Sequence, residues 1–182
     1  MSSPGRHATG ARGKASPGEQ PPFVADAGPL IALAKVDGLQ LLKGLFGYGV
    51  IPPAVHQEVR PHSGLPGATR IRQALAAGWL QVAPLEDDTL ATELLGLVDA
   101  GEAEAIALCR QRQARVLLID DAKGRKVARR AGLPLVGVAG ILLAAKSRGL
   151  LSAVGPVLED LAGAGYRLSY QLMDAVRRTA NE

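Results

Sequence analysis

The sequence has little cysteine and few aromatic residues. Cys109 is the only cysteine among 182 residues, and aromatic residues make up 3% of the chain. A single thiol excludes an intramolecular disulfide and fits a reducing, cytoplasmic location. With so few aromatics, the core must consist of Leu, Val, Ile and Ala. This favours helices packed on a parallel sheet over an all-β sandwich, and Cys109 itself is expected to be a small core residue.

Long apolar runs are also missing. No stretch of about 18 apolar residues occurs, so we expect no membrane span. The basic N-terminus is not followed by an apolar segment, so we do not expect a secretory signal. The net charge of +4 is a mild indication of a polyanionic partner. On charge alone, a basic composition unrelated to nucleic acid explains it equally well.

The chain divides into two parts by composition. Residues 1–20 are rich in Gly, Ser, Pro and Arg without periodicity, which predicts a disordered basic tail. Residues 21–182 are expected to form one domain in which short apolar strands alternate with helices. Strands are predicted at 22–26, 49–51, 79–83, 115–120 and 133–138, and helices at 29–35, 39–46, 54–60, 68–78, 87–98, 101–113, 122–132, 139–149, about 153–163 and 169–180. This alternation predicts an α/β fold with a mainly parallel sheet of about five strands.

Acidic residues fall at the ends of two of these strands. Asp26 ends the first strand, and Asp120 ends the strand at 115–120. Glu58 lies on the helix after the second strand, and Glu102 lies in the first turn of its helix. The carboxyl ends of parallel strands share one edge of a sheet, which is where ligands bind. Carboxylates about 4 Å apart repel by roughly 4 kcal/mol, and a hard cation such as Mg²⁺ or Mn²⁺ relieves that repulsion.

Each acid also has a simpler explanation. Asp26 could cap the helix that follows it, and Asp120 or Asp121 could cap the helix that begins at residue 122. Asp99 and Glu102 have the spacing of a capping box. Glu58 alone could be a surface acid, and Glu104 could be solvated or capping. Only the joint pattern favours an acidic metal site, and whether Asp99, Glu104 or Asp121 contributes to it stays open.

Three segments resemble the PIN-domain family of metal-dependent ribonucleases, which includes the VapC-type toxins. They are FVADAGPLIALAK (23–35), VIPPAVHQEV (50–59) and DAGEAEAIALCRQRQARVLLIDDAKGRKVA (99–128). The similarity extends from residue 22 to about 140, and the following GVAGILLAAKSRGL (137–150) resembles an uncharacterised PIN-like subgroup.

The resemblance implies a three-layer α/β/α fold and a Mg²⁺- or Mn²⁺-dependent endoribonuclease, with water attacking the phosphodiester in line. The catalytic residues would be Asp26, Glu58, Glu102 and Asp120, of which Asp26, Glu102 and Asp120 would bind the metal. It also implies a toxin or toxin-like protein that acts on RNA, dimerises and binds a cognate antitoxin. Two alternatives remain, a non-catalytic PIN-like module that binds RNA or protein, and an α/β phosphohydrolase acting on small phosphates.

The helix predicted at 122–132 is strongly basic. Gly124, Val127, Ala128 and Ala131 fall on one stripe of this helix, which we expect to face the core. The remaining positions carry Lys123, Arg125, Lys126, Arg129 and Arg130. Cations beside an acidic site suit an RNA backbone, and the shortage of aromatics argues against base stacking. An ordinary solvated helix face is the alternative.

Overall fold

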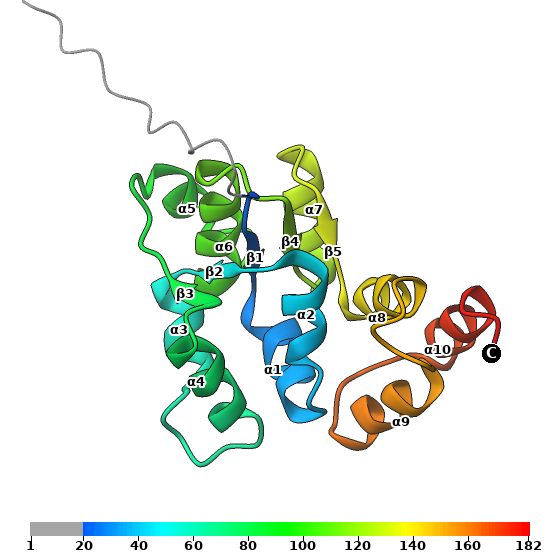
Figure 1. The fold of residues 1–182 in the computed structure, drawn as a ribbon. Coiled ribbons are helices and arrows are strands. Elements are labelled where there is room, and N and C mark those ends of the chain that lie inside the picture. The colour runs from blue at the N-terminus through cyan, green and yellow to red at the C-terminus, as the bar shows by residue number, and fades with distance from the viewer. Residues whose placement is uncertain (1–19) are drawn as a thin grey trace, which may run out of the picture.

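The structure is a computed structural model, and it describes residues 20–182 (Figure 1). The tail predicted at residues 1–20 therefore lies outside the described residues, except for Gln20. No helix within residues 20–182 combines the length and the apolar character that crossing a membrane requires.

A parallel sheet of five strands forms the centre of the domain, as the sequence predicts. Its order is β3-β2-β1-β4-β5, and every neighbouring pair is parallel. The strands are β1 (Phe23–Ala25), β2 (Gly49–Ile51), β3 (Leu80–Val82), β4 (Val116–Leu118) and β5 (Leu135–Val136). The chain moves outward from β1 to β3 and then returns to add β4 on the other side of β1. The boundary between β1 and β4 is thus a topological switch point, the usual place for a ligand site in such sheets.

Ten helices connect or follow these strands in the described part of the chain, close to the predicted positions. They are α1 (Ala27–Lys35), α2 (Leu39–Phe46), α3 (Pro53–Val59), α4 (Ala68–Ala76), α5 (Thr89–Leu94), α6 (Ala100–Gln111), α7 (Ala122–Arg130), α8 (Val138–Ser147), α9 (Gly155–Gly163) and α10 (Tyr170–Thr179). The largest difference concerns α5, which is only six residues long. After α5 the chain forms turns up to Val98, before α6 begins.

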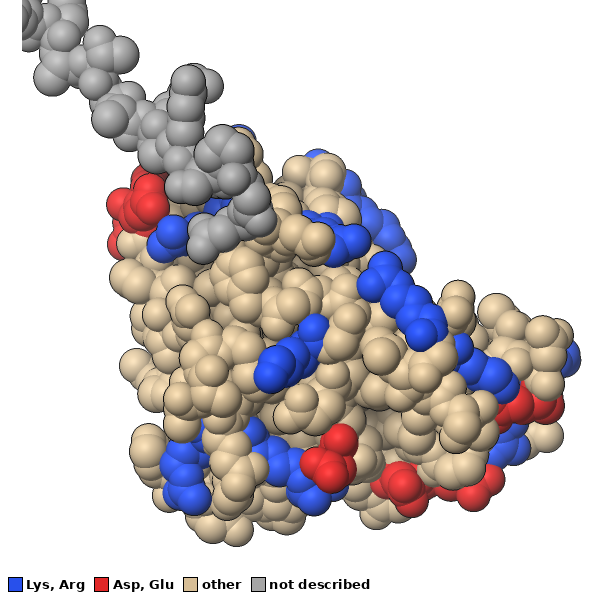
Figure 2. Space-filling model, in the orientation of Figure 1, with Lys and Arg blue, Asp and Glu red and all other residues tan. Residues whose placement is uncertain are grey.

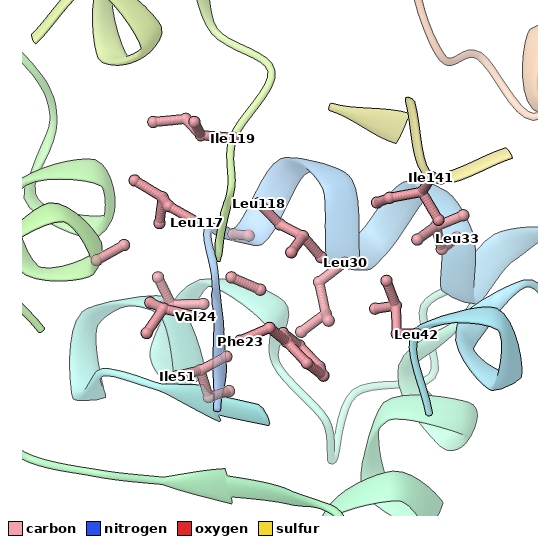
Figure 3. Packing of buried hydrophobic residues seen from close by; sticks show 14 of the residues in the cluster. Phe23, Val24, Leu30, Leu33, Leu42, Ile51, Leu117, Leu118, Ile119 and Ile141 are labelled. Carbon is pink, nitrogen blue, oxygen red and sulfur yellow. The ribbon is translucent and has the colours of Figure 1, made fainter. Parts of the chain in front are cut away.

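The helices cover both faces of the sheet, which gives the three layers implied by the family resemblance. In Figure 3, Phe23 and Leu118 point to the same side as Leu30 of α1 and Leu42 of α2, and Val24 and Leu117 point to the other side. Helix α6 contacts β1 and β4.

The core is aliphatic, as the composition predicts. Phe23 and Phe46 form the one aromatic ring pair in the described residues, with centroids 5.8 Å apart. Cys109 is buried on α6, which confirms its expected place in the core. Each fully buried aliphatic or Phe side chain stabilises the fold by roughly 1.5–3 kcal/mol relative to exposure. This rigid sheet fixes the positions of the residues that follow β1 and β4.

Candidate functional site

Asp26 lies at the carboxyl end of β1, on the switch point. Its backbone N–H donates to the carbonyl of Leu118 on β4 at 2.9 Å, which joins the ends of the two central strands. Its carboxylate caps α1 by accepting from the N–H of Gly28 at 3.4 Å. The capping role weighed from the sequence is therefore real. It uses only Oδ2, and the side chain is 8% exposed.

Three carboxylates converge on the backbone of Gly101, in the first turn of α6. A β-carbon at Gly101 would lie 3.1 Å from Glu58 Oε2, 3.4 Å from Asp99 Oδ1 and 3.6 Å from Asp26 Oδ1. The three acids come from α3, from the N-cap of α6 and from the end of β1. Because Gly101 has no side chain, the carboxylates can gather in the space beside it.

Burial, and then this crowding, raise the pKa values of Asp26 and Glu58. Burial, followed by the charges of Glu58 and Asp99, raises the pKa of Asp26 to about 6. Burial and the charge of Asp99 also raise the pKa of Glu58. Both shifts have burial as their largest cause, and the neighbouring carboxylates add to it.

Glu102 forms the capping box that its spacing predicts. Asp99 Oδ1 accepts from the N–H of Glu102 at 2.9 Å, and Glu102 Oε2 accepts from the N–H of Asp99 at 3.3 Å. The other oxygen, Oε1, is buried and has no hydrogen-bond partner among the described residues. The side chain is 5% exposed. Burial first, and then the charge of Asp99, raises the pKa of Glu102 to about 7. The capping box therefore uses only one oxygen of the Glu102 carboxylate, Oε2, and leaves Oε1 without a role in capping.

Asp120 is held by different partners. The N–H of Val138, the first residue of α8, donates to its two carboxylate oxygens at 3.2 and 3.3 Å. The hydroxyl of Tyr166 donates to Oδ2. Burial and this hydrogen bond raise the pKa of the Tyr166 phenol, so the phenol stays protonated and remains a donor. Nothing in the sequence marks Tyr166, because it lies in the loop between α9 and α10, outside any recognisable motif.

Two neighbouring acids have structural roles. Asp121 is the N-cap of α7 and accepts from the N–H groups of Lys123 at 2.7 Å and Gly124 at 3.1 Å. Glu104 Oε2 accepts from the N–H of Ala54 at 2.9 Å, so it caps α3 from a distant helix. Of the additional candidates left open by the sequence, Asp99 is the one that lies beside Asp26 and Glu58.

Two shallow pockets flank the start of α6, and Asp99 lines both. The first, of about 340 Å³, is lined by Leu95, Gly96, Leu97, Val98, Asp99, Glu102, Asp121 and Lys123. The second, of about 450 Å³, is lined by Ala54, Gln57, Glu58, Arg60, Asp99, Ala100 and Gly101. Asp26 and Asp120 line neither pocket. Within residues 20–182, no three His, Cys, Asp or Glu side chains are arranged to hold one metal ion together. The assignment of catalytic and metal-binding residues therefore stays a prediction.

The basic residues of α7 differ in their surroundings. Lys123 is exposed and lines the first pocket. Arg125 is half-buried, and its Nη1 donates to the carbonyl of Ile119 at 2.7 Å beside Asp120. Lys126, Arg129 and Arg130 are exposed. Figure 2 shows basic side chains over α7 at the upper right, whereas acidic side chains gather along the lower edge near α9.

Of the four residues that were expected to face the core from α7, three do so and the last does not. Gly124 and Ala128 are buried and Val127 is partly buried, but Ala131 is exposed. The helix ends at Arg130, and Gly132 follows with a positive φ of 71°, the left-handed conformation in which glycine commonly ends a helix. Ala131 therefore lies in the turn that leads away from the core.

Comparisons with known proteins give one match. A family model for a PIN domain matches residues 22–182, which covers all five strands and all ten helices. No curated protein and no solved structure matches the chain.

Proposed function

The chain belongs to the PIN-domain family, whose members are generally nucleases, and we propose that it is a divalent-metal-dependent endoribonuclease. The observation that carries the proposal is the convergence of Asp26, Glu58 and Asp99 at Gly101. The next residue of α6, Glu102, adds a buried oxygen, Oε1, that has no hydrogen-bond partner among the described residues. Of these acids Asp26 and Glu102 are buried, whereas Glu58 and Asp99 are exposed. Burial of the first two beside further carboxylates does not serve stability, because desolvation and repulsion oppose folding. Perturbed pKa values of this kind are typical of functional sites.

The acids suit Mg²⁺ or Mn²⁺ in their chemistry. All donors are carboxylate oxygens, which hard divalent cations prefer, and within residues 20–182 Glu102 Oε1 has no hydrogen-bond partner. Mg²⁺ commonly binds through one or two carboxylates and keeps several waters, so its binding does not require three protein side chains around the ion. Asp26 and Glu102 would hold the ion, with Asp120 as the further ligand that the family resemblance implies. Such an ion, when bound, stabilises charge that builds on a phosphodiester and activates water.

The remaining residues would bind and orient the substrate. Glu58 is exposed at the second pocket, where its carboxylate would accept a proton from water; burial and the charge of Asp99 raise its pKa, which strengthens it as a base. Arg60 at the second pocket and Lys123 at the first provide one cation on each side of the acids. An RNA strand that crosses the start of α6 would place its phosphates between them.

One observation favours a non-catalytic binding module as the second candidate. Asp120 already accepts hydrogen bonds from Val138 and Tyr166, so in this structure its carboxylate has a structural role. A module of this kind would bind RNA or a protein through the same surface without cutting RNA. A toxin role, a cognate antitoxin and a homodimer remain predictions from the family resemblance.

Cleavage of labelled single-stranded RNA by the wild type and by Asp26→Asn tests the proposal. The wild type should cut RNA only with Mg²⁺ or Mn²⁺, and the variant should be inactive. Asp160→Asn, at an exposed acid on α9, is the matched control and should cut normally. RNA binding without cleavage in either ion would favour the binding module. Turnover of small phosphate esters with intact RNA would favour a phosphohydrolase.

A further inference from the structure

We propose that the first pocket is a nucleobase subsite, in which two leucines of the turn after α5 contact the face of one base of the bound RNA. The inference rests on the proposed function and deepens it, because it adds contact with a base to contact with the phosphates. The pocket adjoins the acids, since Asp99 lines it and belongs to the carboxylates that converge on Gly101. Its volume of about 340 Å³ lies within the range of small-molecule sites.

One part of the pocket is apolar and exposed. Leu95 is 55% exposed and Leu97 is 58% exposed, and both line the pocket. No other large apolar side chain that is exposed within residues 20–182 lines either of the two pockets beside the acids. Single exposed leucines are ordinary on a protein surface. A pair of them at a pocket next to converging polar groups is typical of a binding surface.

The turn that carries these leucines is held by its backbone. The N–H groups of Leu97 and Val98 both donate to the carbonyl of Leu94, at 2.9 and 3.1 Å. The side chain of Leu94 belongs to the hydrophobic core, and α5 packs against α6. The exposed leucines are therefore part of an anchored turn that leads directly into Asp99.

The polar part of the pocket includes the start of α7. Asp121 caps this helix through Oδ1, and its Oδ2 accepts no hydrogen bond from the described residues. Lys123 is exposed and belongs to none of the ion pairs within residues 20–182. One carboxylate oxygen and one ammonium group at the pocket are thus free to bind a ligand.

A nucleotide of single-stranded RNA matches this combination. The faces of its base are apolar, the edge of the base carries polar groups, and the sugar joins the base to a phosphate. The leucines would contact a face, Asp121 Oδ2 would accept from an amino group at the edge, and Lys123 would bind the phosphate. Contact with leucine is burial of apolar surface and not aromatic stacking, so the small number of aromatic residues does not oppose it.

The second pocket offers no comparable apolar surface. Its only apolar side chains are those of Ala54 and Ala100, and its other residues are polar or glycine. The base subsite is therefore assigned to the first pocket alone, and the second pocket contacts the strand through Arg60.

Two ligands of equal length test the inference, a single-stranded RNA oligonucleotide and an abasic ribose-phosphate chain. Binding is measured by fluorescence anisotropy in EDTA, so that no RNA is cut. Leu97→Ala should weaken the binding of RNA by about tenfold, or roughly 1.4 kcal/mol, because the side chain loses most of its contact with the base. It should not change the binding of the abasic chain, which keeps the phosphates and lacks the bases. In cleavage with Mg²⁺ or Mn²⁺, its KM for RNA should rise while kcat stays unchanged.

Leu65→Ala is the matched control. Leu65 is 55% exposed in the loop between α3 and α4 and lines neither pocket. The control should bind RNA and the abasic chain as the wild type does. Urea unfolding of both variants shows whether either substitution changes the fold.

The outcomes separate the base subsite from the nuclease proposal. If Leu97→Ala binds RNA as tightly as the wild type, the inference is wrong whether or not RNA is cut. An equal loss of affinity for RNA and for the abasic chain also contradicts it, because the loss would not depend on a base. A wild-type dimer that becomes monomeric in Leu97→Ala, with RNA binding unchanged, would make the leucines a contact between two copies instead. If the loss is confined to RNA but the wild type cuts no RNA with either ion, the nuclease proposal fails and the base subsite stands.

Discussion

The unpaired Oε1 of Glu102 on α6 lies against the backbone of Gly124 on α7. A β-carbon at Gly124 would lie 2.5 Å from this oxygen and 2.5 Å from Ile119 Cδ1. The close approach of the two helices buries one side of the carboxylate. The carboxylate is thus largely removed from water and costly to ionise, which, together with the charge of Asp99, is the reason for its raised pKa.

Gly124→Ala should destabilise the protein because a methyl group has no room between Glu102 and Ile119. Overpacking of this kind costs about 1–3 kcal/mol. Urea unfolding in EDTA measures the change. Gly163→Ala at the end of α9 is the control, since a β-carbon there meets no atom within 4 Å. Equal stability of the two variants would mean that α6 and α7 do not approach as closely as described.

Glu102→Gln should raise the melting temperature at pH 8 in EDTA, because it replaces a buried charge with a neutral amide of the same shape. The same variant should lose most of the stabilisation that Mg²⁺ gives the wild type. Glu93→Gln, at an exposed acid of α5, should change neither quantity. A full Mg²⁺ response in Glu102→Gln would remove Glu102 from the predicted metal ligands.

The stability of the wild type in EDTA should increase as the pH falls from 8 to 6. The pKa values of Glu102 and Asp26 are raised to about 7 and about 6. The folded protein therefore binds these protons more tightly than the unfolded chain, and their contribution to stability is lost as the pH rises through this window. Thermal unfolding at several pH values measures the slope. Saturating Mg²⁺ should flatten it, and a slope unchanged in Glu102→Gln would contradict the assignment.

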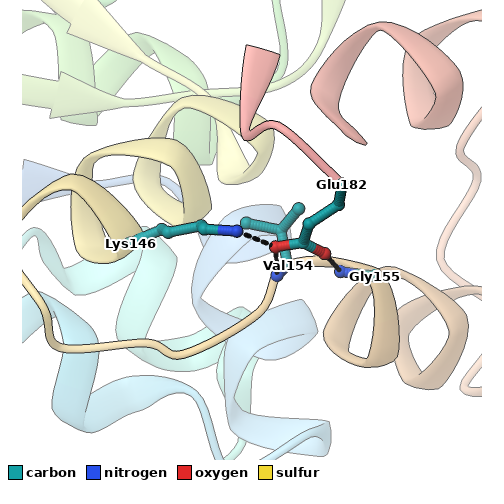
Figure 4. Close-up of polar contacts among 4 residues, drawn as sticks. All are labelled: Lys146, Val154, Gly155 and Glu182. Carbon is teal, nitrogen blue, oxygen red and sulfur yellow. Dashed lines mark hydrogen bonds and ion pairs between the residues drawn. The ribbon is translucent and has the colours of Figure 1, made fainter. Parts of the chain in front are cut away.

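Glu182→Gln should destabilise the protein at pH 7, and the difference from the wild type should shrink as the pH falls. Its hydrogen bond with Lys146, followed by those from Gly155 and Val154 (Figure 4), lowers the pKa of Glu182 to about 2. The contribution is complete above the ordinary pKa near 4.5 and is lost as the pH falls toward about 2. Urea midpoints at pH 7 and pH 3 test this. Glu159→Gln, which breaks an exposed ion pair with Arg177, should have little effect at either pH.

Arg60→Ala and Lys123→Ala should each weaken the binding of single-stranded RNA measured in EDTA. Loss of one phosphate contact should reduce the slope of log affinity against log salt by about 0.7. Arg72→Ala, at an exposed cation of α4 outside both pockets, should leave affinity and slope unchanged. If all three variants have the same slope of log affinity against log salt, RNA does not cross the start of α6.

Several features of the site follow from the sequence alone because they act over a few residues. The spacing of Asp99 and Glu102 predicts the capping box, and the position of Gly132 predicts the end of α7. The short apolar strands and the helical patterns between them predict the parallel sheet. Hydrogen bonds to the nearest N–H groups and side-chain periodicity are local properties, so a single sequence carries them.

Other features depend on how distant elements pack. Asp99 lies near Asp26 and Glu58 because the start of α6 packs with Gly101 against both carboxylates. Glu104, on the same helix, instead accepts a hydrogen bond from the backbone of Ala54 on α3. Tyr166 reaches Asp120 only because α9 is tied to α1 and α8. These contacts are set by the crossovers of the sheet and by the distances between packed helices. Such distances bear no simple relation to the number of residues between the partners, so only the tertiary structure decides them.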